Sequence, residues 1–94
     1  MSYRVVVSRR VKDLLEELHR KERTRCRELA LLLLRLEKDP RPDGSRKLAS
    51  EGSDSKRRYS REERMWDQAG FRIVYRLGDA QRLVEIGVVS KTSG

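Results

Sequence analysis

Apolar and polar residues alternate most regularly along residues 71–77, with the sequence FRIVYRL. Strand side chains point alternately to opposite faces, so the aromatic and aliphatic residues at every second position share one face. Arg72 and Arg76 share the other face, with a valine between them. The pattern predicts a strand that buries its first face and carries arginines on its second. The turn-forming residues 78–80 and the β-rich run 83–89 then predict an antiparallel hairpin.

The first half of the chain has the spacing of amphipathic helices. Ser8 is a residue type favoured at helix N-caps, and the apolar residues after it recur at spacings of three, one and three. They are Val11, Leu14, Leu15 and Leu18. The polar segment 19–25 is expected to hold the turn to a second helix over residues 24–38, which the prolines at 40 and 42 end.

Two further strands complete the predicted set of elements. Residues 3–7 form a short β-branched run, and residues 64–66 are expected to resume a strand beside the hairpin. The predicted order is therefore strand, helix, helix, strand, strand, strand. We expect one α+β domain over residues 1–94, in which the N-terminal helical hairpin packs on a twisted antiparallel sheet.

The apolar stripe of the second predicted helix is wider than contact with one sheet requires. The stripe is widened by three leucines beyond the positions that would face the sheet: Leu31, Leu32 and Leu34. The extra width predicts either burial on two sides or a surface that another protein covers.

Hydrophobic periodicity stops in residues 44–63, which we expect to form a flexible basic loop. One interpretation is a solvated, mobile segment. The other is an arm that lies along a phosphate backbone, with a tyrosine available to stack on a base. The candidate nucleic-acid-binding residues of this segment and its flanks are Lys47, Lys56, Arg57, Arg58, Tyr59, Arg61 and Arg64.

The net charge of +8 on 94 residues favours a partner rich in negative charge, such as nucleic acid or an acidic protein. Cys26 is the only cysteine, so no intramolecular disulfide is expected, and a reducing, cytoplasmic location fits best. No metal motif, phosphate-binding glycine loop or nucleophile elbow occurs. No apolar run approaches the roughly 18 residues of a membrane span, so no membrane partner is expected.

The order of these elements resembles the RelE/ParE superfamily of toxins from type II toxin–antitoxin modules. The resemblance rests on the opening YRVVVS, the leucine-rich helix before DPRPDG, the pair Lys47 and Leu48, and the glycine-aromatic-arginine signature from Gly70 to Tyr75. It covers nearly the whole chain. It implies a helical hairpin over one side of a twisted sheet, with the other side engaging the target.

The RelE-like branch of the family cleaves mRNA in the ribosomal A site without a metal or cofactor. The resemblance implies that Arg72 is the arginine at the scissile phosphate and that Lys91 is a supporting catalytic cation. A planar guanidinium suits this role because its donors can stabilise charge developing on a phosphate. The resemblance also implies a cognate antitoxin as partner, for which Leu31, Leu32 and Leu34 are the candidate contacts.

Three positions depart from the RNA-cleaving pattern. Glu63 and Met65 stand where that branch carries lysines, unless a gap in the loop lets Arg61 and Arg64 take these positions, and Thr92 stands where it carries a basic residue. Loss of such groups lowers the rate of phosphodiester cleavage. Three functions therefore stay open: an endoribonuclease that cleaves mRNA on the ribosome, a ParE-like poison of DNA gyrase, and a non-catalytic relative that only binds its antitoxin.

Arg72 also has a purely structural interpretation. An arginine on a strand can serve as the partner of a carboxylate on the same sheet face. The candidates for that carboxylate are Asp67, Asp79 and Glu85.

Overall fold

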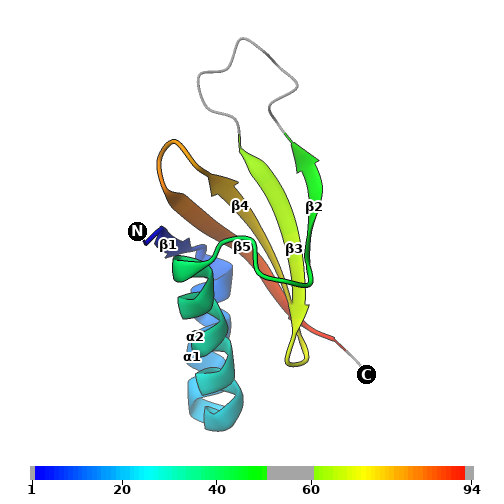
Figure 1. Cartoon of the computed structure of the whole chain (residues 1–94). Coiled ribbons are helices and arrows are strands. Elements are labelled where there is room, and N and C mark those ends of the chain that lie inside the picture. The colour runs from blue at the N-terminus through cyan, green and yellow to red at the C-terminus, as the bar shows by residue number, and fades with distance from the viewer. Residues whose placement is uncertain (1, 51–60, 93–94) are drawn as a thin grey trace.

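The computed structural model describes residues 2–50 and 61–92, and the predicted α+β class is confirmed. The described residues form two helices and five strands (Figure 1). In order they are β1 (Arg4–Val7), α1 (Arg9–Lys21), α2 (Arg23–Lys38), β2 (Ser45–Ser50), β3 (Glu62–Gln68), β4 (Phe71–Gly78) and β5 (Leu83–Lys91).

The five strands form one sheet in the order β1-β5-β4-β3-β2. Strands β2 to β5 pair antiparallel with their neighbours, which confirms the predicted hairpin of β4 and β5. The expectation of a wholly antiparallel sheet is wrong, because β1 pairs parallel to β5. No tight turn connects these two strands, so the local sequence does not fix the direction in which they pair.

Strand β2 was not predicted, and it replaces the start of the expected loop over residues 44–63. It lies at the edge of the sheet and pairs only with β3, with a register shift between Lys47 and Ala49. An edge strand that is solvated on both faces needs no alternation of apolar and polar residues, which explains the missing signal. The rest of the expected loop, residues 51–60, lies outside the described residues.

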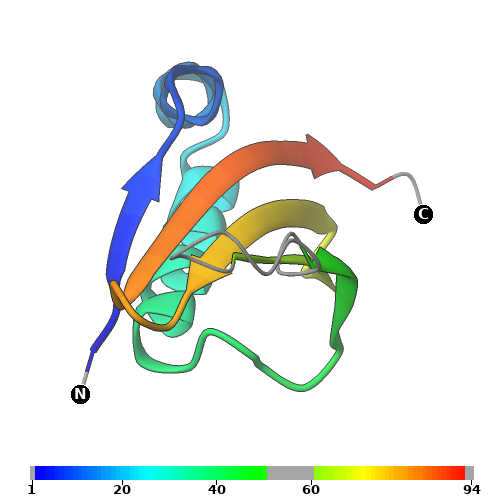
Figure 2. The same ribbon diagram turned by 90° about the horizontal axis from the view of Figure 1, so that it is seen from above.

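The helical hairpin forms as predicted and covers one face of the sheet (Figures 1 and 2). The hydroxyl of Ser8 accepts a hydrogen bond from the Val11 amide at 3.3 Å, as an N-cap should. Only Glu22 separates the two helices, so the turn is shorter than the expected seven residues. The helices pack against the β1 and β5 side of the sheet, far from β2.

The core lies between the helices and the predicted apolar face of β4. Phe71, Ile73, Tyr75 and Leu77 are all buried, as the alternation predicted. They pack with leucines of both helices and with the buried residues of β5, Val84, Ile86 and Val89. The Tyr75 hydroxyl donates a hydrogen bond to the carbonyl oxygen of Pro40 at 2.6 Å, which ties the connection after α2 to the sheet.

A two-residue turn joins β3 to β4. Ala69 and Gly70 both have positive φ, 53° and 81°, as the central residues of a type I′ hairpin turn require. Arg25 of α2 holds this turn, because its Nη1 donates to the Ala69 carbonyl at 2.9 Å and its guanidinium lies 4.4 Å from the Phe71 ring centroid. The turn therefore fixes the register of β3 and β4 and is anchored to the helical hairpin.

Candidate nucleic-acid interface

The face of the sheet turned away from the helices is covered by no other element of residues 2–50 and 61–92. Partners in antiparallel register share a face, so the strand pairing identifies its members. We call this surface the open face. It comprises Arg46, Arg61, Glu63, Met65, Asp67, Arg72, Val74, Arg76, Glu85, Val88 and Ser90.

Arginines and carboxylates from different strands form ion pairs on the open face. Arg76 lies 3.9 Å from Glu63 of β3, and Arg61 forms an ion pair with Glu85 of β5. Each exposed pair contributes only about 0–1 kcal/mol to folding, since water and salt screen it. Four arginines against three carboxylates leave the open face with a small excess of positive charge.

Arg72 makes the best-defined contact of the open face. Its Nε donates to Oδ1 of Asp67 at 2.9 Å and its Nη2 to Oδ2 at 3.1 Å. The type I′ turn places the two residues opposite each other in register. The hydrogen bonds from Arg72 hold the pKa of the Asp67 carboxyl below its usual value, and the charge of Arg46 acts in the same direction. Of the three carboxylates considered as partners for Arg72, the structure selects Asp67.

The two residues predicted to be catalytic do not come together. Arg72 is paired in register with Ser90 on the open face, whereas Lys91 is paired with the buried Phe71 on the helix-covered face. The Lys91 ammonium lies 2.6 Å from the Glu22 carboxylate, at the junction of the two helices. A site built from both cations is therefore not present in this arrangement.

The predicted nucleic-acid-binding residues are also divided between the two faces. Arg61 lies at the open face, but Lys47 and Arg64 are in register with each other on the opposite face. The Arg64 guanidinium there contacts the Ser45 hydroxyl at 3.0 Å and pairs with Glu62. Lys56, Arg57, Arg58 and Tyr59 lie outside the described residues.

Glu63 and Met65, two positions at which the sequence differs from the RNA-cleaving pattern that it resembles, also lie on the open face. Glu63 and Met65 alternate with Asp67 along β3, so all three share that face. Glu63 pairs with Arg76, and Met65 is buried next to Val74. The face therefore has a carboxylate and a thioether at the positions where the RNA-cleaving branch is expected to carry lysines.

Sequence reasoning missed the part that Arg46 plays in the open face. Its place depends on β2, a strand that no periodic pattern in the sequence marks. The role of Asp67 depends on the register of β3 and β4, which the dipeptide Ala69-Gly70 sets. A glycine in a two-residue interval between β-rich runs is the signal that identifies this turn from sequence.

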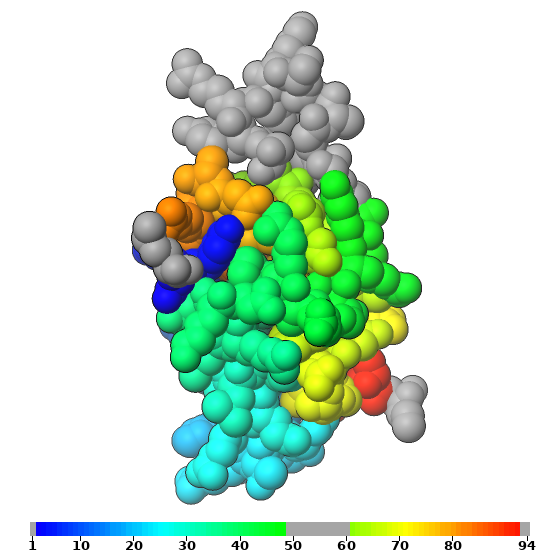
Figure 3. Space-filling view, in the orientation of Figure 1, coloured from blue at the N-terminus to red at the C-terminus, as the bar shows by residue number. Residues whose placement is uncertain are grey.

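Helix α2 presents a second surface, visible at the front of the molecule (Figure 3). Leu31 and Leu34 are 59% and 55% exposed, whereas Leu32 is 9% exposed and belongs to the core. Two of the three leucines predicted to contact a protein partner, Leu31 and Leu34, therefore face outward, and Leu32 does not. The same exposed side of the helix carries Arg23, Arg27, Arg35 and Lys38. The carboxylates of α2, Glu28 and Glu37, are half-buried, so this leucine-and-cation stripe has a basic character.

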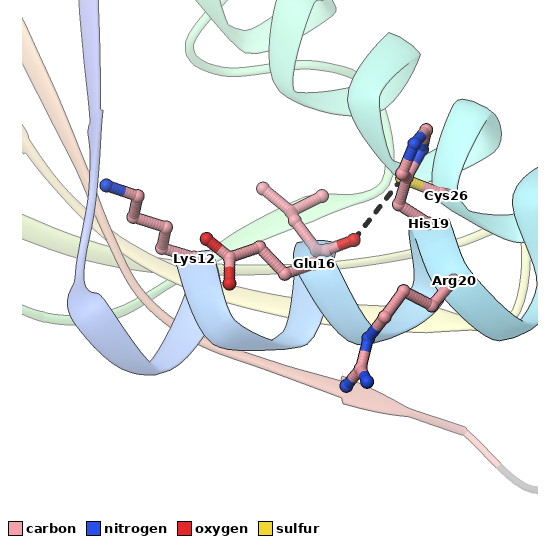
Figure 4. A pocket seen from close by; sticks show the side chains of 6 residues that line it. Lys12, Glu16, His19, Arg20 and Cys26 are labelled. Atoms are coloured by element: carbon pink, nitrogen blue, oxygen red, sulfur yellow. Dashed lines mark hydrogen bonds between the residues drawn. The ribbon is translucent and has the colours of Figure 1, made fainter.

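A groove of about 500 Å³ lies beside the junction of the helices (Figure 4). Lys12, Leu15, Glu16, His19, Arg20 and Cys26 line it. The Cys26 thiol donates a weak hydrogen bond to the Leu15 carbonyl at 3.5 Å. The described residues contain no group of three or more side chains suited to hold a metal ion. None of the described helices is long and apolar enough to cross a membrane.

Comparison with known proteins adds no assignment. No protein-family model matches the chain, and neither curated proteins nor solved structures include a significant match.

Proposed function

We propose that this chain is the toxin-like component of a type II toxin–antitoxin module and that it inhibits translation by binding mRNA on the ribosome along its open face. The observation that carries the proposal is the arrangement of arginines on a sheet face that no described helix covers. Arg46, Arg61, Arg72 and Arg76 come from three strands or their ends and face the same side. Arginine side chains bind phosphate oxygens through paired donors, so such a face suits a sugar–phosphate backbone.

Cleavage of the bound RNA would depend on Arg72 without the help of Lys91. Arg72 is half-exposed on the open face, where its guanidinium can stabilise the negative charge of a pentacoordinate phosphate. Lys91 is engaged with Glu22 on the opposite face. A site with one cation fewer loses a large part of its transition-state stabilisation, so we expect slow cleavage or arrest of translation by binding alone.

The leucine-and-cation stripe of α2 supports the second half of the proposal, a cognate antitoxin. Two exposed leucines, Leu31 and Leu34, lie among cations on one side of the helix. An amphipathic segment rich in leucine and carboxylates would bury its apolar residues there and pair its charges with the arginines. A nucleic acid would leave both leucines without apolar contacts, so this stripe suits a protein partner better.

Two other functions stay as alternatives. A ParE-like gyrase poison would use the same fold against a protein–DNA complex. A relative that only binds its antitoxin would keep the α2 stripe without any toxic activity. The separation of Arg72 from Lys91 is compatible with both, because neither needs a phosphodiester-cleaving site.

Induced expression of the chain, with growth and mapped RNA 5′ ends as readouts, tests the proposal. The comparison needs Arg72→Ala and, as a matched control, Arg10→Ala on the exposed side of α1. We expect growth arrest and inhibited protein synthesis with wild type and Arg10→Ala, and recovery with Arg72→Ala. New in-frame 5′ ends would add cleavage to the activity. Arrest through inhibited supercoiling, or normal growth beside tight antitoxin binding, would overturn the translational proposal.

A further inference from the structure

Three charged side chains from three neighbouring strands share the open face. Asp67 of β3 is directly opposite Arg72 of β4, and Arg46 of β2 is opposite Met65, two residues before Asp67 along β3. Arg72 contacts Asp67 directly, and the charge of Arg46 also acts on this carboxylate. We call these residues the Asp67 cluster. It holds two cations for one anion, so it would still attract a second anionic group.

The contact between Arg72 and Asp67 occupies one complete edge of the guanidinium. Nε and Nη2 donate in parallel to the two carboxylate oxygens. The same two donors bind two phosphate oxygens when arginine forms a bidentate contact with nucleic acid. The Asp67 carboxylate therefore lies where two oxygens of a bound phosphate would otherwise be.

The pair is accessible from solvent. The Arg72 and Asp67 side chains are 47% and 46% exposed. An ion pair at such a site is weak, since water solvates both charges when they separate. A phosphate of an incoming chain can therefore displace the carboxylate without opening the fold.

We propose that Arg46 and Arg72 form a phosphate-binding site and that Asp67 competes with the phosphate for it, so that Asp67 limits the affinity of the open face for RNA. The identification of the anion as an RNA phosphate rests on the function proposed above. The carboxylate acts as an internal competitor, and its removal frees the bidentate edge of Arg72 for the ligand.

A role for Asp67 as general base is the competing interpretation of the same geometry. A base for RNA cleavage needs a carboxylate oxygen free to accept a proton and a pKa near the working pH. Both oxygens of Asp67 are engaged by Arg72, and the pKa of this carboxyl lies below its ordinary value. Both observations favour competition, and the two roles predict opposite effects of the same substitution.

The test measures binding of a fluorescein-labelled, single-stranded uridine oligonucleotide by anisotropy over a series of salt concentrations. The informative variant is Asp67→Asn, and Asp13→Asn on the exposed side of α1 is the control with the same change in net charge. We expect Asp67→Asn to bind about three- to fivefold more tightly than wild type, from the removal of a competing ion pair. One additional phosphate contact would also steepen the plot of log K against log salt by about 0.7.

Three further comparisons make the result specific. Asp67→Ser should reproduce the gain, which separates loss of the carboxylate from a particular effect of asparagine. The double variant Asp67→Asn with Arg72→Ala should lose the gain, because the freed guanidinium edge is then absent. Asp13→Asn should change affinity by less than about twofold, as expected for one screened surface charge.

Equal affinities of Asp67→Asn and Asp13→Asn would overturn the proposal, and so would weaker binding by Asp67→Asn. The proposed function would still stand in both cases if wild type binds the RNA and Arg72→Ala binds it more weakly. Absence of binding by wild type and every variant would overturn both proposals. RNA cleavage that Asp67→Asn abolishes while binding persists would replace competition with the general-base role.

Discussion

The Asp67 carboxylate accepts two hydrogen bonds from the Arg72 guanidinium, and both residues lie two positions from the β3–β4 turn on the open face. Because Arg72 lowers the pKa of Asp67 in the folded protein, the ion pair stabilises the fold only while Asp67 is ionised. The stabilisation is complete above the ordinary aspartate pKa of about 3.9, and it is lost as the pH falls through the lower pKa that Asp67 has in the folded protein.

Arg72→Ala should therefore lower the melting temperature at pH 7, and this difference from wild type should shrink as the pH falls below about 4. Thermal unfolding followed by circular dichroism between pH 2 and pH 7 measures the effect. Arg10→Ala provides the control for loss of one exposed arginine. A difference for Arg72→Ala that stays constant over the whole pH range would show that the pair with Asp67 does not stabilise the fold.

Tyr75→Phe should lower the free energy of unfolding by about 1–2 kcal/mol, because the carbonyl oxygen of Pro40 loses its buried donor. Tyr3→Phe removes a hydroxyl that donates to Asp79 at 2.7 Å on an exposed surface, where water replaces the donor. We therefore expect Tyr3→Phe to lower the free energy of unfolding by less than Tyr75→Phe does. Urea denaturation of the two variants compares them directly, and equal losses would contradict the assigned role of the Tyr75 hydroxyl.

Gly70→Ala should destabilise the fold by about 1–3 kcal/mol, because the turn needs a positive φ of 81° and an added Cβ would lie 2.7 Å from Nη2 of Arg25. Gly87→Ala is the matched control, since its Cβ would make only an ordinary contact of 3.8 Å with the Val74 carbonyl. Adding Arg25→Ala to Gly70→Ala should recover the part of the loss due to crowding. Equal melting temperatures of the two glycine variants would refute this account of the turn.

Leu32→Ala and Leu34→Ala should differ sharply although the residues are two positions apart on α2. Leu32 is in the core, so its truncation should cost about 2–4 kcal/mol. Leu34 is exposed, so its truncation should change stability by less than about 0.5 kcal/mol. Chemical denaturation of each variant measures both values. A loss of stability for Leu34→Ala as large as that for Leu32→Ala would mean that the leucine-and-cation stripe of α2 is packed against the rest of the fold.

The sequence predicted the elements whose pattern is set by one buried face. The alternation in residues 71–77 identified β4 and its core side, and the stripe after Ser8 identified α1 with its N-cap. Strand β2 escaped prediction because no face of it is packed against the core, and its place is fixed by hydrogen bonds to β3. The parallel pairing of β1 with β5 depends on contacts between residues far apart in the chain, which no local pattern encodes.

The candidate site was predictable only in part for the same reason. Alternation along β4 is enough to place Arg72 and Arg76 on one face. The face on which Lys91 lies follows from the register of β5 across the shift between Val74 and Tyr75, which the sequence does not reveal. The partner of Arg72 was narrowed to three carboxylates, and the register of the β3–β4 hairpin decides among them.

The measurement that tests the central claim most directly is an NMR titration of the ¹⁵N-labelled chain with a short single-stranded RNA. We predict that amide shifts will concentrate on the open face, at Asp67, Arg72, Val74, Arg76 and Val88, and will be small along α2 at Leu31 and Leu34. Shifts confined to α2, with the open face unchanged, would contradict the proposal that this face binds RNA.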